Sequence, residues 1–187
     1  MPRRLALIQG YPDPKGSHLC HALGDAYAEG AAVGGHQVTR IEVARLDFPM
    51  MRTREEFETD QLPQSLVEAR DAIVAAQHLV VTFPLWLGTM PALLKAFLEQ
   101  VMRPSVALEY RKHGFPKGLL AGRSARLIVT MGMPAPIYRW YFRAHGVRGL
   151  ERSVLRFAGI KPVRETLLGM VDAASDAKRQ GWLGRLS

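Results

Sequence analysis

The sequence has few of the features that mark secreted or membrane proteins. It contains a single cysteine, Cys20, so no disulfide can form within the chain, and this favours the reducing cytoplasm. Its apolar runs, such as LIVTMGMPAPI, are far shorter than the roughly 20 residues that a membrane-spanning helix needs. The apolar run at the N-terminus is also too short for the core and cleavage site of a secretion signal. We therefore expect a cytoplasmic protein without a membrane span.

Motifs for metals and nucleic acids are missing as well. The close set of His18, Cys20 and His21 does not have the spacing of a structural zinc site, so no metal is expected. The net charge of +8 could favour an anionic small molecule such as a dinucleotide, or a nucleic acid. The basic residues are scattered, however, and form no dense run or known recognition motif. We interpret the charge as a generally basic surface and expect no nucleic-acid partner.

Apolar runs and helical patterns alternate along the 187 residues, a length that is typical of one domain. We predict strands at 4–10, 37–46, 78–83, 124–134 and 163–171. We predict helices at 18–35, 64–77, 91–103, 136–146, 150–159 and 172–186. Residues 47–63 are interpreted as a long surface connection, and residues 105–123 as an irregular excursion or a short hairpin.

This alternation of strands and helices predicts the fold class. Parallel strands need crossover connections, and the crossover helices cover both faces of the sheet. Five strands suit the flavodoxin-like order 2-1-3-4-5, whose switch point lies between the first and third strands. We therefore predict one α/β domain over residues 1–187, a three-layer sandwich with a five-stranded parallel sheet. The loops after the first, third and fourth strands would line one crevice.

The loop after the first strand, GYPDPKGS (10–17), is expected to bind an anion. It lacks the two-glycine dinucleotide fingerprint and the Gly-Lys-Ser/Thr ending of a P-loop, so ATP hydrolysis is not expected. Ser17, His18 and Leu19 would present backbone N–H groups at a helix N-terminus, which favours a phosphate. The alternatives are that Ser17 only caps its helix and that His18 is merely solvated.

The loop after the third strand, PLWLGTMP (84–91), carries an aromatic residue but no acid, base or metal ligand. Such a loop favours a site that holds a reactive cofactor over a site whose side chains perform the chemistry. The alternative is that Trp86 is an ordinary core aromatic residue.

Three motifs together resemble one known family. The run FPLWLGTMPALLKAFLEQVM (83–102) resembles the signature of the flavodoxin-like NAD(P)H:quinone reductase family. YPDPKGSH (11–18) resembles the phosphate loop of that family, and TMGMPAPIY (130–138) resembles its third flavin loop. The motifs occur in the order and spacing of the family, so the resemblance extends over most of the chain.

The resemblance implies a role for each matching residue. The flavin phosphate would be held by Ser17, His18 and Leu19. The isoalloxazine ring and its polar edge would be lined by Pro84, Leu85, Trp86 and Leu87. The pyrimidine end of the ring would be closed by Thr130, Met131, Gly132 and Met133. Two residues would serve catalysis: Tyr138 beside the reacting face and His145 in proton handling.

The resemblance also implies an activity. NADPH or NADH would reduce bound FMN, and a quinone, azo or nitro compound would then take two electrons in a ping-pong reaction. FMN is favoured over FAD because no extra segment is available to hold an adenosine. The family implies a homodimer in which each pocket is completed by the partner chain. Residues 47–63 and 105–123 are the candidate contacts.

Departures from the family pattern support a second hypothesis. Tyr11 stands where a histidine is common, Leu19 stands near an asparagine position, and methionines occupy the third loop where threonine and glycine are usual. These changes favour a regulatory or ancillary binding subunit with little catalysis as the alternative. A third hypothesis, an electron carrier of the flavodoxin type, conflicts with the basic charge, since flavodoxins are strongly acidic.

Overall fold

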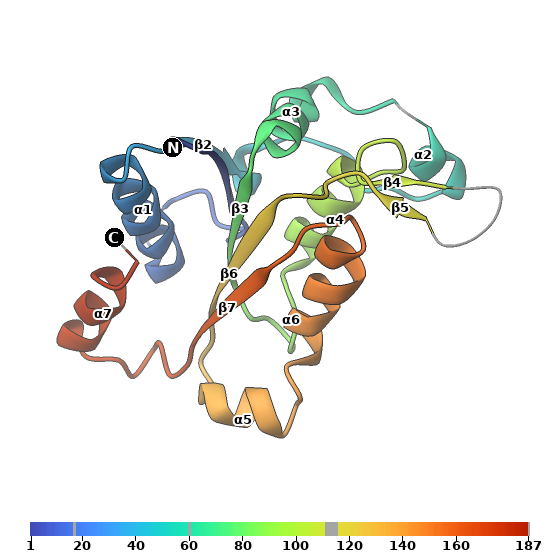
Figure 1. Ribbon diagram of the computed structural model, residues 1–187. Coiled ribbons are helices and arrows are strands. Elements are labelled where there is room, and N and C mark those ends of the chain that lie inside the picture. Colours follow the sequence, from blue (N-terminus) through green and yellow to red (C-terminus); the bar gives the residue numbers. More distant parts are fainter. Residues whose placement is uncertain (17, 60, 111–115, 187) are drawn as a thin grey trace.

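The computed structural model describes residues 1–16, 18–59, 61–110 and 116–186. Its main sheet has five parallel strands in the order β2-β1-β3-β6-β7 (Figure 1). These strands are β1 (Arg4–Gln9), β2 (Gln37–Glu42), β3 (His78–Pro84), β6 (Ser124–Thr130) and β7 (Val163–Leu168). Since β6 and β7 are the fourth and fifth strands of this sheet along the chain, the predicted order 2-1-3-4-5 is confirmed.

Helices cover both faces of the sheet. They are α1 (Leu19–Val33), α2 (Arg54–Glu58), α3 (Val67–Ala75), α4 (Ala92–Val101), α5 (Ala135–Trp140), α6 (His145–Gly149) and α7 (Asp176–Leu183). Helix α6 continues as a π-helix over Leu150–Arg156. Helices α1 and α7 lie on one face, and α3, α4 and α6 lie on the other (Figure 1). The result is the predicted three-layer arrangement.

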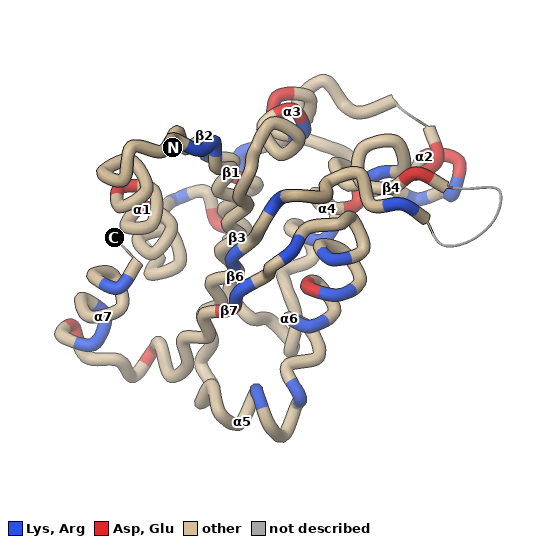
Figure 2. Tube along the Cα trace, viewed as in Figure 1, with Lys and Arg blue, Asp and Glu red and all other residues tan. Residues whose placement is uncertain are grey.

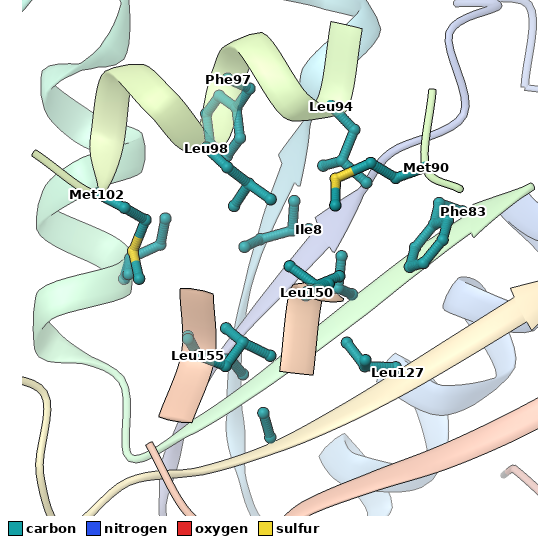
Figure 3. Close-up of a cluster of buried hydrophobic side chains, with 14 of the residues drawn as sticks. Ile8, Phe83, Met90, Leu94, Phe97, Leu98, Met102, Leu127, Leu150 and Leu155 are labelled. Atoms are coloured by element: carbon teal, nitrogen blue, oxygen red, sulfur yellow. The ribbon is translucent and has the colours of Figure 1, made fainter. Parts of the chain in front are cut away.

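The larger of the two cores lies under α3, α4 and α6 (Figure 3). Helix α4 places Leu94 and Phe97 on its buried side, and both are fully inaccessible to solvent. They face Ile8 and Phe83 of the sheet, while Leu150 closes the cluster from the π-helix (Figure 3). Side chains alternate along a strand, so the other face of the sheet supplies a second core under α1 and α7. Burying both faces requires the near-continuous apolar runs that are found in the central strands β1, β3 and β6.

Element boundaries differ from the predictions in several places. The fourth strand of the sheet ends at Thr130 and the fifth at Leu168, and the helix predicted at 136–146 is divided between α5 and α6. The strand expected at 37–46 ends at Glu42, because the chain turns into a 3₁₀ helix over Val43–Arg45. The closing helix begins at Asp176 and not at 172, because the side chain of Ser175 caps it by accepting a hydrogen bond from the Lys178 N–H at 3.3 Å.

The two connections contain short elements. Residues 47–63 include the five-residue helix α2. Residues 105–123 contain an antiparallel pair, β4 (Leu108–Glu109) and β5 (Lys117–Gly118), which confirms the short hairpin. Within the described ranges, no helix has the length and apolar character needed to cross a membrane.

Candidate functional site

The loops that follow β1, β3 and β6 surround a cavity of about 440 Å³ at the carboxyl ends of the sheet. Open α/β sheets bind ligands at this position. The cavity is lined by Tyr11, His18, Leu19, Cys20, Pro84, Leu85, Trp86, Thr130, Met131, Gly132, Val171, Asp172 and Arg179. Three segments that are distant in sequence therefore meet, as the strand order requires, and the segment before and within α7 joins them.

The structure brings most of the predicted site residues to this cavity. They are His18, Leu19, Pro84, Leu85, Trp86, Thr130, Met131 and Gly132. Four others do not line it: Leu87, Met133, Tyr138 and His145. Ser17 lies outside the described residues.

One end of the cavity is suited to an anion. Helix α1 begins there, its N-cap residue His18 makes no side-chain capping hydrogen bond, and its first turn has no acidic residue. Free N–H groups and the helix dipole make such an end attractive to negative charge. The imidazole of His18 stacks on Tyr11 with ring centroids 4.0 Å apart, and its Nε2 lies 2.9 Å from Oδ2 of Asp13. The ring is thus held in place, and its hydrogen bond lowers the pKa of Asp13.

Arg179 of α7 adds a positive charge at the same end. Its Nη2 donates to the Val171 carbonyl oxygen at 3.4 Å, and its Nη1 lies 3.9 Å from the exposed carboxylate of Asp176. Its Nε is buried and has no hydrogen-bond partner among the described residues. A buried donor without a partner costs free energy, so this group fits an anionic ligand bound in the cavity.

The loop after β3 forms a wall with a sharp turn at its tip. Trp86 and Thr89 exchange backbone hydrogen bonds of 2.9 and 3.0 Å, and this closes a two-residue turn. Both central residues have positive φ, 48° at Leu87 and 81° at Gly88, as a type I′ turn requires. The side chain of Leu87 is fully exposed at the tip. Trp86 therefore lines the cavity, whereas Leu87 points away from it.

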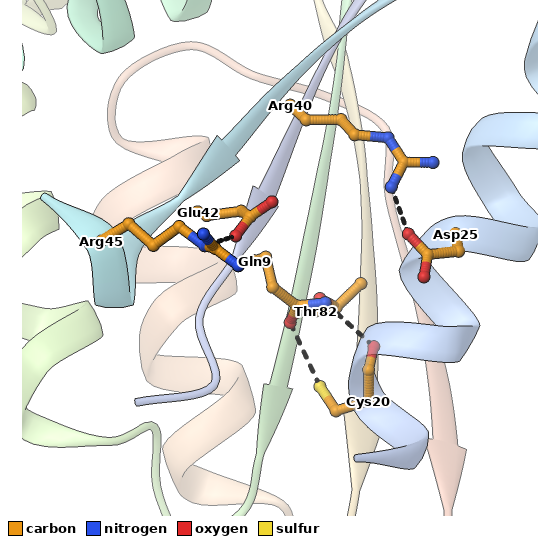
Figure 4. A network of polar contacts seen from close by, with 7 residues as sticks. All are labelled: Gln9, Cys20, Asp25, Arg40, Glu42, Arg45 and Thr82. Carbon is orange, nitrogen blue, oxygen red and sulfur yellow. Dashed lines mark hydrogen bonds and ion pairs between the residues drawn. The ribbon is translucent and has the colours of Figure 1, made fainter. Parts of the chain in front are cut away.

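A buried polar network joins Gln9, Thr82 and Cys20 (Figure 4), and Cys20 also lines the cavity. Thr82 Oγ1 donates to Gln9 Oε1 at 2.6 Å, and Gln9 Nε2 donates to the Cys20 carbonyl oxygen at 3.1 Å. The Cys20 thiol donates to Gln9 Oε1 at 3.5 Å. Burial raises the pKa of this thiol to about 12, so it is neutral at physiological pH. The network holds Cys20 at the cavity and gives this residue a structural role.

Tyr138 has a different position from the one that the resemblance implies. Its side chain is fully buried, its hydroxyl donates to the Gly88 carbonyl oxygen at 3.0 Å, and the same hydroxyl accepts from the Val147 N–H at 3.2 Å. Burial raises the pKa of Tyr138. In this position the ring joins the β3 loop to α6 from within the core and does not face the cavity.

His145 lies next to the same turn. Its ring is exposed, and its Nδ1 is 2.8 Å from the Phe142 carbonyl oxygen. Its Nε2 would be 3.6 Å from a Cβ atom placed on Gly88. The histidine is therefore near the rim of the loop, and its role in proton handling stays a prediction.

Sequence reasoning did not identify the contribution of the C-terminal segment. Val171, Asp172 and Arg179 line the cavity, yet the sequence predicts only the end of the fifth strand at Val171 and a closing helix over the other two. No local motif marks them, because their proximity to α1 depends on α7 packing beside α1 on the same face of the sheet.

Comparison with known proteins gives a consistent picture. The family described as "Flavodoxin-like fold" matches residues 3–186. The FMN-dependent NADH:quinone oxidoreductase 1 of Hahella chejuensis is 35% identical over 113 residues, covering 60% of this chain and 51% of that protein. The chain spans about half the length of such curated relatives.

Solved structures agree over the whole fold. A protein from Streptococcus mutans superposes with a TM-score of 0.78 at 25% identity, covering 97% of this chain and 95% of its own. The NAD(P)H:quinone oxidoreductase of Methanothermobacter marburgensis gives a TM-score of 0.81 at 21% identity, covering 100% of this chain and 94% of its own, and that likeness concerns the fold alone.

Proposed function

We infer the function of this chain from its family and its cavity: the chain belongs to the proteins with a flavodoxin-like fold, whose match extends over residues 3–186. We propose that it is a flavin-dependent oxidoreductase that uses NADH or NADPH to reduce quinones or related small electrophiles. One observation carries the proposal: a single cavity combines an end suited to an anion, at the start of α1 and Arg179, with an aromatic wall at Trp86. A flavin mononucleotide has a phosphate at one end and a flat ring at the other.

The residues divide between the two ends of the cofactor. We propose that the N–H groups at the start of α1, with Ser17, His18, Leu19 and Arg179, hold the phosphate. The ring would be lined by Pro84, Leu85, Trp86, Thr130, Met131 and Gly132, with Leu87 and Met133 at the edges of their loops. When bound, the flavin supplies the hydride chemistry, accepting two electrons from a nicotinamide and passing them to the acceptor.

The protein contributes binding, orientation and electrostatics. The stacked ring of His18 and the half-buried Arg179, whose Nε is buried and lacks a partner among the described residues, would fix the phosphate, so the position of the flavin ring would follow from this anchor. The wall at Trp86 would shield one side of the bound ring from water. Tyr138 positions that wall by its hydrogen bond to the Gly88 carbonyl oxygen, and His145 at the rim is the nearest candidate for proton exchange with solvent.

FMN is favoured over FAD. The curated relatives from Hahella chejuensis and Jannaschia are named FMN-dependent NADH:quinone oxidoreductases. We also propose a cytoplasmic location, because the one cysteine of the chain is a free and buried thiol.

An absorbance spectrum of the purified protein tests the proposal directly. We expect a yellow protein whose flavin bands bleach when NADH or NADPH is added without oxygen and return when a quinone is added. A protein that stays colourless after incubation with FMN would contradict the enzyme hypothesis and favour the ancillary binding subunit.

We further propose that the protein forms a homodimer. Four apolar side chains on and just after α5 are exposed: Ile137, Trp140, Tyr141 and Phe142. Such a group on a soluble protein usually marks an interface. This group adjoins the loop after β3, because Tyr138 of the same helix donates a hydrogen bond to the Gly88 carbonyl oxygen. A second copy that contacts this group would therefore lie close to the cavity. The segments expected to form the contact, 47–63 and 105–123, border a separate groove of about 300 Å³ that includes Phe57 and Tyr110.

Sedimentation velocity distinguishes these surfaces. We expect the wild type to sediment as a dimer, and Trp140→Glu to sediment as a monomer because a charge would be buried in the contact. Tyr110→Glu serves as the matched variant on the other groove. Dissociation by Tyr110→Glu alone would place the contact at the originally expected segments, and a monomeric wild type would contradict the proposal.

A further inference from the structure

A second cavity, of about 400 Å³, lies at the opposite end of the strands from the candidate flavin site. It is formed at the amino ends of β1, β3, β6 and β7. Its lining includes Arg3, Tyr27, His36, His78, Arg126 and Arg164, and it contains no aspartate or glutamate. The cavity therefore gathers basic side chains without local compensation.

The cavity exists because α1 and α7 cover only part of their face of the sheet. Helix α7 has eight residues, and the apolar side chains beneath it include Ile128 and Leu168, toward the carboxyl ends of β6 and β7. Toward the amino ends, the same face carries the partly exposed Arg126 and the exposed Arg164. Along both β6 and β7, the side chains on this face change from apolar to basic where α1 and α7 no longer cover the sheet.

Two of these arginines are direct neighbours. Arg126 of β6 and Arg164 of β7 are register partners on adjacent parallel strands, and Figure 2 shows basic positions side by side on these two strands. Like charges in that arrangement destabilise a sheet. Among the described residues, neither arginine has a carboxylate within ion-pair distance, and the same holds for Arg3.

Arg126 is also held in a fixed orientation. Its Nε and Nη2 both donate to Thr166 Oγ1, at 3.2 and 3.0 Å, and its guanidinium carbon lies 5.8 Å from the centre of the Tyr27 ring. A guanidinium has five N–H donors, so its remaining donors are available to a ligand. Such a planar, fixed group is well suited to binding phosphate oxygens in pairs.

His78 lies among the same basic side chains. Its Nε2 lies 3.1 Å from the Tyr27 hydroxyl and its Nδ1 lies 2.7 Å from Ser124 Oγ, so the ring is fixed within the cavity. Burial lowers the pKa of His78, and the charges of Arg126, Arg3 and Arg164 lower it further. All three arginines line the same cavity as this ring.

We propose that this cavity binds a small phosphate-bearing anion with two or more negative charges, at a site separate from the flavin phosphate. The basic side chains converge on one recess and do not follow a stripe along the surface, which favours a small ligand over a polynucleotide. Bound anion would offset the repulsion between Arg126 and Arg164 and would therefore stabilise the fold. This proposal rests on the cavity and does not require the oxidoreductase function.

Calorimetric titration with inorganic pyrophosphate tests the proposal. The protein is first saturated with FMN, so that the proposed phosphate position at α1 is filled. The test variant is Arg126→Gln/Arg164→Gln, and the matched control is Arg148→Gln/Arg152→Gln, which removes the same charge from exposed positions outside the cavity. We expect pyrophosphate affinity to fall by about tenfold or more in the test variant and by about twofold or less in the control.

Thermal unfolding with and without pyrophosphate provides a second test that does not depend on the heat of binding. Without pyrophosphate, the test variant is expected to unfold at the same temperature as the wild type or a higher one, because repulsion has been removed. With pyrophosphate, only the wild type and the control variant should gain stability. Equal binding by both double variants would overturn the proposal. A single-stranded oligonucleotide that binds through the same arginines more tightly than pyrophosphate would also overturn it, in favour of a nucleic-acid site.

Discussion

Leu87 has a backbone conformation that few side chains favour. Its φ of 48° lies in the left-handed region, and its side chain gains nothing from burial because it is fully exposed. The residue that follows is Gly88, so the turn resembles the favoured Asn-Gly type I′ turn with a leucine in the first position. A strained, exposed apolar residue at the rim of a cavity is more simply explained by contact with a partner or ligand than by stability.

Replacing Leu87 should therefore stabilise the isolated protein. We expect Leu87→Asn to raise the free energy of unfolding by about 1 kcal/mol, because asparagine tolerates positive φ. Leu87→Ala is the control, since alanine removes the side chain but keeps the strain, and it should give little or no gain. Urea unfolding measures both variants. A loss of stability in Leu87→Asn would show that the leucine side chain makes a stabilising contact in solution.

Cys20 lines the cavity, but its chemistry is suppressed. The thiol is buried and bonded to Gln9, and burial raises its pKa from 9.0 to about 12. The folded state therefore keeps a proton that the unfolded state loses above pH 9. The thiol stabilises the folded state fully below pH 9, and this contribution disappears as the pH rises toward 12.

Unfolding experiments at alkaline pH test this assignment. Between pH 9 and 11, the wild type should lose stability faster than Cys20→Ser by about 1 kcal/mol for each pH unit, because serine does not titrate. The comparison cancels other groups that ionise in this range, including Tyr11. Identical pH dependence of the two proteins would show that the thiol is not protected as the structure indicates.

At the scale of elements, the contact between α6 and the β3 loop is the most restrictive one near the site. A Cβ atom on Gly146 would lie 2.2 Å from the Gly88 carbonyl oxygen, so only glycine permits this approach. Tyr138 joins the same two elements with its hydroxyl. Together they fix the loop that carries Trp86, and this links the packing of α6 to the shape of the cavity.

Two glycines of α6 provide a matched pair for testing this contact. Gly146→Ala should lower the free energy of unfolding by about 1–3 kcal/mol, because backbone atoms must move apart. Gly149→Ala should raise it by about 0.5–1 kcal/mol, since a Cβ there meets no atom within 4 Å and alanine favours a helix. Flavin titration of Gly146→Ala should also show weaker binding. Equal effects of the two substitutions in urea would contradict the close approach.

The boundaries of elements were predicted less well than their order. The second strand ends four residues before the expected position, at Glu42. Apolar alternation continues through the 3₁₀ helix, so the pattern alone does not show where pairing with β1 stops. The register of the two strands shows where pairing stops, because Gln9 and Glu42 are their last paired residues.

At the scale of the whole molecule, the site joins the two ends of the chain. Helix α1 follows the first strand and helix α7 follows the last strand, yet His18 at the start of α1 and Arg179 of α7 line the same cavity. Their meeting depends on the sheet order, which places α1 and α7 side by side on one face (Figure 1). The cofactor we propose would therefore bridge the N-terminal and C-terminal parts of the protein.

A substitution in α7 tests this bridging. We expect Arg179→Gln to weaken FMN affinity by about tenfold, because one charged donor to the phosphate is removed. Arg152→Gln is the control, with the same change of charge at an exposed position away from the cavity. Quenching of flavin fluorescence on binding measures the affinity. If both variants bind FMN equally, Arg179 does not hold the phosphate.

The sequence alone determined the fold class, the strand order and the loops that form the crevice. The elements follow from local patterns, since apolar runs, caps and turn residues are set by neighbours a few positions away, and the strand order follows from the flavodoxin-like arrangement that five alternating strands suit. The burial of Tyr138, the approach of Arg179 and the pairing of Arg126 with Arg164 were decided only by the tertiary structure. Each depends on which segments the crossovers bring together, and no local pattern encodes the distance between residues that are far apart in the chain.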